Sequence, residues 1–112
     1  MIPANAIAAD RTRPPEATLA EAFALLGPEI VVAHAKDLRP AGAGEAEPEF
    51  CTAGAGIVPW DRCVAHLRAV GYAGPLILHT LTEAEAPGAV AFLRGRIAAT
   101  AATARSHSRP RR

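Results

Sequence analysis

Two segments of the sequence share one pattern, in which a short apolar run ends in polar residues. The first, residues 30–37, reads Ile-Val-Val-Ala-His-Ala-Lys-Asp. The second, residues 75–79, follows a glycine and also ends in a histidine. Strand side chains alternate between two faces, and a run that starts apolar on both faces is typical of a buried parallel strand. We therefore predict parallel strands over 30–36 and 75–79.

An amphipathic helix is predicted between these two strands, over residues 59–70. Its apolar residues recur at helical spacing: Trp60, Val64 and Leu67. Gly71 suits the position just after the helix. A strand–helix–strand unit of this length makes its two strands parallel. His34 and His79 then leave the sheet at the same edge, where ligands gather in parallel α/β folds.

The amino-terminal part of the chain is predicted to add one strand end and one helix. Residues 2–6 are predicted to end a strand or to lie in the loop after it. Thr18 and Glu21 have the spacing of a capping box, and Gly27 followed by proline ends the helix that starts there. The segment 38–58 is rich in Gly, Ala and Pro and is predicted as a long loop. Loops of this length after a strand are often the rims of active sites.

The carboxyl-terminal part is predicted to hold one more helix. Thr82 and Glu85 form a second possible capping box, and Pro87 places the helix start near Ala86. The apolar stripe of this helix is Val90, Leu93 and Ile97. Residues 98–112 are alanine-rich and then basic, and we predict a disordered tail there. The predicted fold class is α/β, with one domain over residues 1–97.

Composition limits what this domain can be. Of the 112 residues, 27 are alanine, and Leu, Ile, Val and Phe together number only 24, which predicts a thin core. The net charge of +1 gives the body of the chain no basis for binding nucleic acid. No run approaches the length needed to span a membrane. Cys51 and Cys63 lack metal or redox spacing, and two free thiols favour a cytoplasmic location.

Lys36 changes how the first strand end is interpreted. It is the only lysine, beside eleven arginines, so lysine is not scattered over the surface of this protein. It shares a strand face with His34 by alternation. One interpretation is a hydrogen-bonded core histidine followed by a solvated strand exit. The other is a functional site, which the second histidine at the same sheet edge favours.

Three stretches resemble the sugar phosphate isomerase/epimerase family: His34-Ala35-Lys36-Asp37, the glycine-rich residues 53–60, and residues 67–76. That family has the xylose-isomerase-like TIM barrel. Residues 1–5 resemble the end of its sixth strand, and the likeness covers roughly residues 1–95. The resemblance implies a partial (β/α)8 barrel made of about the last three β/α units.

The resemblance also implies a site. His34 matches a ligand of a divalent metal, for which Mn²⁺, Mg²⁺, Zn²⁺ and Co²⁺ are the options. His79 and Lys36 are the implied catalytic residues: His79 could serve as a ligand or as an acid/base group, and Lys36 would hold a substrate oxygen or phosphate. Residues implied to contact substrate are Asn5, Arg39 and Asp37. Two positions depart from the family pattern, because Ile2 replaces an aspartate and His79 replaces the last glutamate. Those changes favour Zn²⁺ over Mg²⁺, with Asp37 or Glu83 as a third ligand.

Three functions follow as hypotheses. The first is a segment of a metal-dependent sugar (phosphate) isomerase or epimerase that moves a proton or hydride on a small carbohydrate. The second is a non-catalytic remnant, or a small subunit that completes a barrel by associating with itself or with a partner chain. The third, DNA repair through the related endonuclease IV type of enzyme, is disfavoured by the lack of clustered positive charge.

Overall fold

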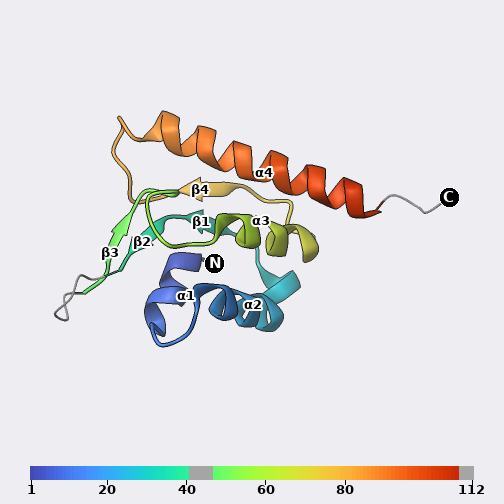
Figure 1. The fold of residues 1–112 in the computed structure, drawn as a ribbon, viewed down its shortest axis with the longest axis horizontal. Helices are drawn as coiled ribbons and strands as arrows, with labels where there is room; N and C mark the ends of the chain where they lie inside the picture. Colours follow the sequence, from blue (N-terminus) through green and yellow to red (C-terminus); the bar gives the residue numbers. More distant parts are fainter. Residues whose placement is uncertain (41–46, 109–112) are drawn as a thin grey trace.

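The computed structural model describes residues 1–40 and 47–108 and shows a mixed α/β fold (Figure 1). Its helices are α1 (Pro3–Ala9), α2 (Pro15–Leu26), the short 3-10 helix η1 (Gly27–Glu29), α3 (Trp60–Ala69) and α4 (Ala86–Ser108). Its strands are β1 (Ala33–Ala35), β2 (Asp37–Arg39), β3 (Glu49–Cys51) and β4 (Leu76–Leu78).

The predicted strand–helix–strand unit is confirmed, with shorter strands. β1 and β4 pair in parallel, with Ala33 opposite Leu76 and Ala35 opposite Leu78. The backbone N–H of His79 continues this ladder by donating to the Ala35 carbonyl at 3.1 Å. Along the chain, α3 lies between β1 and β4, as the predicted crossover requires.

The strand predicted over residues 2–6 is wrong, because α1 occupies Pro3–Ala9. Proline suits the first turn of a helix and alanine is the best helix former, so this segment favours a helix once Ala4 and Ile7 have a core to enter. Of the first nine residues, Met1 alone pairs with β1 as a strand residue does. Its amino group donates to the Val32 carbonyl, and its carbonyl accepts from the His34 N–H at 2.8 Å, which is a parallel pairing with β1.

The first predicted capping box is also wrong. α2 begins at Pro15, before Thr18, whose hydroxyl oxygen is buried without a hydrogen-bond partner in the described part of the chain. Proline in the first turn sets the helical φ angle and starts the helix earlier. The end of α2 was predicted correctly, since the helix stops at Leu26 and Gly27 adopts a positive φ of 26°.

The predicted loop 38–58 contains an antiparallel pair that was not predicted from the sequence. β2 pairs with β3, so that Leu38 lies opposite Phe50. Residues 41–46 of this loop fall outside the described residues. Each strand has only three residues, too few for alternation to be recognised in the sequence.

The end of α3 and the start of α4 follow the local sequence signals. α3 ends in a Schellman motif, in which Gly71 has φ 78° and the Tyr72 N–H donates to the Leu67 carbonyl at 2.9 Å. Thr82 and Glu85 exchange the two side chain to backbone hydrogen bonds of a capping box ahead of α4. α4 continues through Ser108, where disorder was predicted from residue 98 onward. Alanine-rich sequence is also strong helix-forming sequence.

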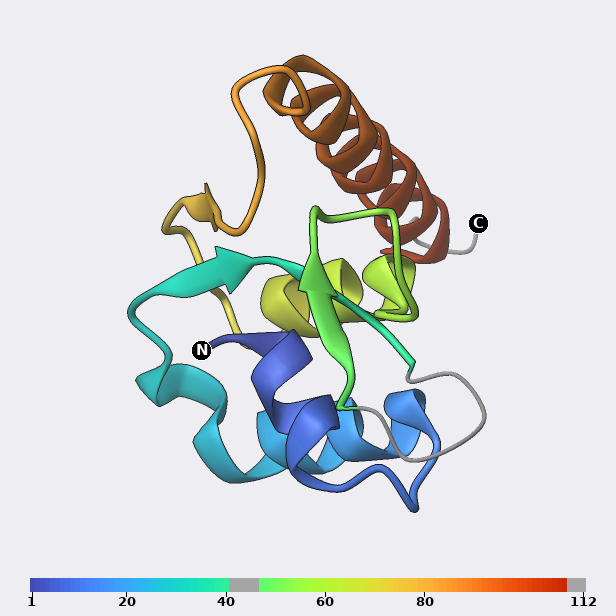
Figure 2. The ribbon, with the colours of Figure 1, turned by 90° about the vertical axis from the view of Figure 1, so that its left-hand side faces the viewer.

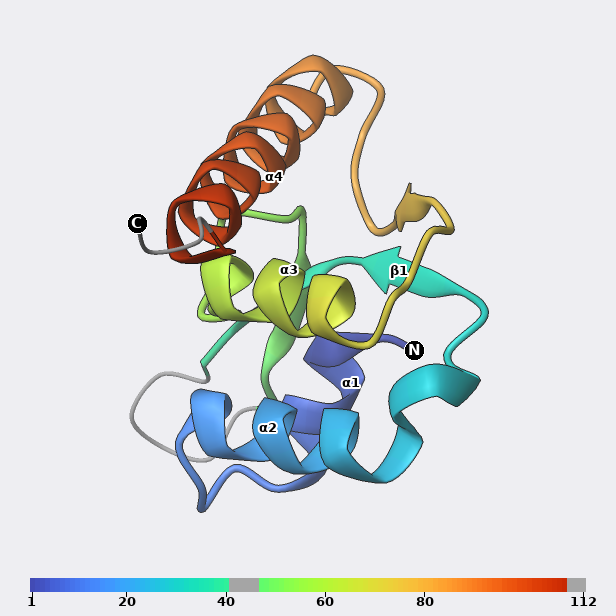
Figure 3. The same ribbon diagram turned by 90° about the vertical axis from the view of Figure 1, so that its right-hand side faces the viewer.

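The core lies on one side of the parallel pair. Ala33 and Ala35 are buried in one cluster with side chains from α1, α2, α3 and α4, among them Leu19, Phe23, Trp60 and Leu93. Figures 2 and 3 show α3 and α4 on the same side of β1 and β4. On the other side, the open face, Val32 and Ile77 are 39% and 41% exposed. Parallel sheets in α/β proteins are normally covered on both faces.

Candidate functional site

The two histidines predicted to share a sheet edge lie side by side. The ring centroids of His34 and His79 are 5.7 Å apart, and the ring planes are inclined by 52°. The parallel register of β1 and β4 places them there, because both residues belong to the open face of the pair. The Nδ1 atom of His34 is buried and has no hydrogen-bond partner within residues 1–40 and 47–108.

Lys36 follows His34 on the same strand face and is buried, with 8% of its surface exposed. Its Nζ lies 3.6 Å from the centroid of the Phe50 ring, on β3. This cation–π contact stabilises the ammonium and fixes where it lies. Among the described residues, no carboxylate lies within ion-pair distance of Lys36.

Thr80 carries backbone strain at the end of β4. Its φ is 59°, a left-handed conformation that β-branched residues avoid. The Thr80 hydroxyl is 2.8 Å from Nδ1 of His79, and this hydrogen bond fixes the orientation of the imidazole. Strain of this kind costs about 1–3 kcal/mol and concentrates at functional sites.

A groove of about 340 Å³ links this strand end to the β2–β3 pair. Its lining includes Phe50, which supports the Lys36 ammonium, and Thr80, which bonds His79. The remaining lining residues are Arg39, Glu49, Cys51, Thr52, Leu81, Thr82 and Glu85. The Thr52 hydroxyl oxygen is buried without a partner among the described atoms. A volume of this size suits a small polar molecule.

Asp37, predicted to contact substrate, has a structural role instead. It is fully buried, and its carboxylate accepts four hydrogen bonds of 2.9 Å each. The donors are the backbone N–H groups of Leu38, Gly54 and Val58 and the Trp60 indole. Asp37 therefore ties β2 to residues 54–60 and leaves little lone-pair capacity for any other ligand.

The other two residues predicted to contact substrate are not brought together. Arg39 lines the groove, where its guanidinium lies 3.9 Å from the Glu49 carboxylate and both side chains are at least half exposed. An exposed pair of this kind adds little stability and leaves the guanidinium accessible. Asn5 is exposed on α1 and is not among the residues that line the groove.

The divalent metal implied by the resemblance does not fit the described residues. Zn²⁺ sites use three or four protein ligands, and Mg²⁺ or Mn²⁺ need several oxygen atoms. His34 and His79 supply two imidazoles, while the Asp37 carboxylate is already occupied by hydrogen bonds. Within the described ranges, no group of three or more His, Cys, Asp or Glu side chains is placed to hold an ion.

The two cysteines are free and buried. Burial raises the pKa of Cys63 to about 12, so this thiol stays protonated at neutral pH. Burial, reinforced by the Asp37 charge, also raises the pKa of Cys51, which lines the groove. Neither thiol has the lowered pKa expected of a nucleophile.

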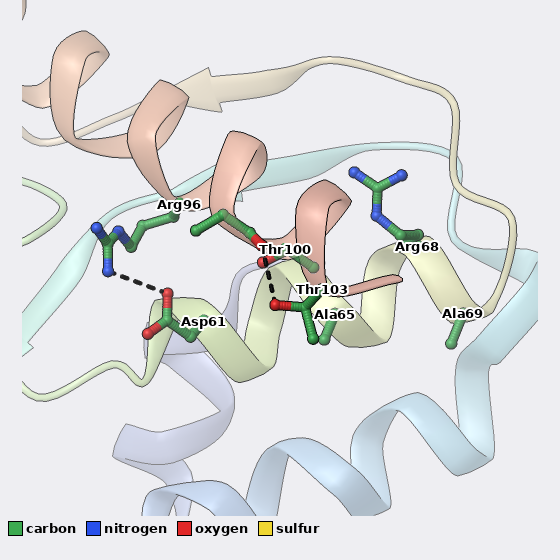
Figure 4. Close-up of a pocket in the computed structure, with 8 residues that line it drawn as sticks. Asp61, Ala65, Arg68, Ala69, Arg96, Thr100 and Thr103 are labelled. Carbon is green, nitrogen blue, oxygen red and sulfur yellow. Dashed lines mark hydrogen bonds and ion pairs between the residues drawn. The ribbon is translucent and has the colours of Figure 1, made fainter. Parts of the chain in front are cut away.

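A second cavity, of about 550 Å³, lies between α3 and α4 (Figure 4). Alanine side chains form much of it, and Asp61 and Arg96 make an ion pair of 3.3 Å at one end while Arg68 stands at the other. It contains none of the residues predicted for the site. Its apolar lining is what two helices leave where small side chains meet between them.

Sequence reasoning missed Phe50, Thr52 and Thr80. Phe50 belongs to the short strand that was predicted as loop, and Thr52 follows that strand directly. Thr80 gave one signal, its place directly after a histidine at a strand end.

None of the helices within the described ranges is both long and apolar enough to cross a membrane. No protein-family model, curated protein or solved structure matches the chain.

Proposed function

We propose that the groove between the β2–β3 pair and the residues after β4 binds a small carbohydrate, and that His79, whose ring bonds the groove residue Thr80, moves a proton on it. The protein would then be a segment of a sugar (phosphate) isomerase or epimerase, in the cytoplasm, where its two free thiols stay reduced. One observation carries the proposal. Two imidazoles lie 5.7 Å apart where the parallel pair of β1 and β4 ends, and the buried Lys36 directly follows β1 along the chain.

The chemistry needs a base, an acid and a positive charge. The His79 imidazole removes the proton on the carbon next to the substrate carbonyl, and the electron pair moves onto the carbonyl oxygen. The Lys36 ammonium stabilises the resulting enediolate, because positive charge next to a developing oxyanion lowers its energy. His79 or His34 then returns the proton to the former carbonyl carbon, while the proton of the adjacent hydroxyl moves to the enediolate oxygen, so that the hydroxyl-bearing carbon becomes the new carbonyl carbon. Both rings act from one face of the sheet, which suits transfer along a single face of the substrate.

Exchange of substrate hydrogen with solvent tests this proposal. The full chain is incubated in D2O with pairs of aldoses and ketoses and their phosphates, and deuterium in the sugar is followed by mass spectrometry. His79→Asn should lower the exchange rate between about a hundredfold and ten-thousandfold, the range for loss of a general base.

The matched control is His66→Asn. His66 stacks on Phe23 with centroids 4.9 Å apart, at the contact between α2 and α3. This variant should keep the wild-type exchange rate as long as circular dichroism shows that it is folded. If the wild-type chain exchanges no sugar faster than buffer does, the proposal is wrong.

A second candidate, a non-catalytic segment that associates, is favoured by the open face of the sheet. Ile77 lies in the middle of β4 and is 41% exposed, and β4 is an edge strand among the described elements. Exposed apolar strand edges favour association.

We expect sedimentation velocity to show concentration-dependent self-association of the chain. Ile77→Lys should shift the protein to monomer, because a charge on this face opposes its burial. Val31→Lys is the control, since it adds the same charge at an exposed valine that lies outside the β1–β4 pair. A wild-type chain that is monomeric at every concentration would contradict self-association.

A further inference from the structure

Lys36 has a setting that few lysines have. It is the only lysine in the chain, it is buried, and no carboxylate in the described ranges pairs with it. Structural lysines normally keep the ammonium in water or against a carboxylate. The Lys36 ammonium instead lies over the Phe50 ring, at 3.6 Å. A salt bridge therefore does not account for its burial.

The imidazoles of His34 and His79 can accept and donate protons near Lys36. The backbone N–H of His79 donates to the carbonyl of Ala35, the residue before Lys36, so the backbones of His79 and Lys36 lie side by side where the parallel pair ends. His34 lies two residues earlier on the same strand face and contacts the His79 ring. Phe50 and Thr80, the respective neighbours of Lys36 and His79, both line the 340 Å³ groove. The groove thus reaches Lys36 through Phe50 and His79 through Thr80, and none of the three residues Lys36, His34 and His79 is itself part of its lining.

We propose that Lys36 is a nucleophilic amine that forms an imine with the carbonyl of a small hydroxyaldehyde or hydroxyketone. Buried lysines beside proton acceptors are used for Schiff-base chemistry in proteins. The proposal rests on the same groove as the proposed function but requires no isomerisation. As an iminium, the substrate would present His79 with a more acidic C–H bond than a free carbonyl does.

The step balances without any oxidant or reductant. The Lys36 ammonium gives one proton to the His79 imidazole, and the neutral amine attacks the carbonyl carbon to form the C–N bond. The carbonyl oxygen takes this proton from the His79 imidazolium and becomes the hydroxyl of a carbinolamine. That hydroxyl takes the second ammonium proton, by way of the imidazole, and leaves as water. The products are the protonated imine and one molecule of water.

The single lysine makes a direct test possible. The full chain is mixed with glycolaldehyde and sodium cyanoborohydride at neutral pH, and peptide mass spectrometry follows the reduced adduct at Lys36 and at the Met1 amino group. We expect Lys36 to be labelled about tenfold faster in the native protein than in urea. Unfolding normally speeds the labelling of a buried lysine, so equal or slower labelling in the native protein would overturn the proposal.

Two variants test the amine and the imidazole separately. Lys36→Arg keeps the charge and the cation–π contact but forms no imine, so only the Met1 adduct should remain. His79→Asn should slow labelling at Lys36 several-fold and leave labelling at Met1 unchanged, with folding checked by circular dichroism. Equal rates at Lys36 in wild type and His79→Asn would overturn the role of the imidazole.

The labelling experiment and the D2O experiment can fail independently. Labelling at Lys36 without sugar exchange in D2O would leave the imine standing and overturn the isomerase proposal. Exchange in D2O without labelling at Lys36 would do the reverse, and would return Lys36 to the role of a charge that stabilises an enediolate.

Discussion

Asp37→Ala is expected to lower the free energy of unfolding by about 3–5 kcal/mol, a large share of what a small domain has. The carboxylate is fully buried and accepts hydrogen bonds from three backbone N–H groups and from the Trp60 indole. A buried donor left without a partner costs about 1–3 kcal/mol, and this variant leaves four. Urea unfolding followed by Trp60 fluorescence measures the loss, since Trp60 is the only tryptophan.

Two further variants test whether the buried position of the Asp37 carboxylate, more than its charge, sets its contribution to the free energy of unfolding. Asp37→Asn keeps one acceptor oxygen and should fall between the wild type and Asp37→Ala. Asp61→Ala removes a carboxylate that is 66% exposed and pairs with Arg96, so it should cost less than about 1 kcal/mol. An Asp37→Ala protein as stable as Asp61→Ala would contradict the structural role of Asp37.

Gly56→Ala should destabilise the protein by about 3 kcal/mol through a steric clash. A Cβ at this position would lie 2.3 Å from the Leu38 carbonyl oxygen and 2.5 Å from Oδ1 of Asp37. Neither atom can move freely. The carbonyl accepts from the Ile57 N–H at 2.9 Å, and the carboxylate holds its four donors. The same urea measurement tests this variant.

Gly95→Ala is the matched control, with the opposite expected sign. Gly95 lies within α4, and an added Cβ there meets no atom within 4 Å. Replacing a helical glycine by alanine should stabilise the protein by up to about 1 kcal/mol. If the two substitutions change stability in the same direction, close packing around Gly56 is not the cause.

Asp37 and Gly56 belong to the scaffold that supports the groove. Asp37 and residues 54–60 lie directly beyond Lys36 along β2 and its partner loop, and they do not line the groove themselves. A loss of activity in an Asp37 variant is therefore expected to follow unfolding. A loss of activity in a folded His79 variant is expected to come from the chemistry.

Local sequence signals determined several elements of this protein. The alternation in residues 30–36 and 75–79, with a helix between them, was enough to predict the parallel pairing of β1 and β4 and the adjacency of His34 and His79. Gly71 and the Thr82–Glu85 pair marked helix ends correctly. Each of these features depends on residues within a few positions of one another, or on the handedness of one crossover.

Long-range packing decided the rest. Asp37 looked like a polar strand exit, and only the approach of residues 54–60 made it a buried acceptor. Phe50 contacts the Lys36 ammonium because β3 pairs with β2. Two strands of three residues each are too short for this pairing to be predicted from the sequence. Residues 3–9 form a helix because Ala4 and Ile7 find a core. The sequence alone therefore determined which strand edge carries His34 and His79. The partners of the side chains there came from segments far apart in the chain, whose pairing only tertiary contacts specify.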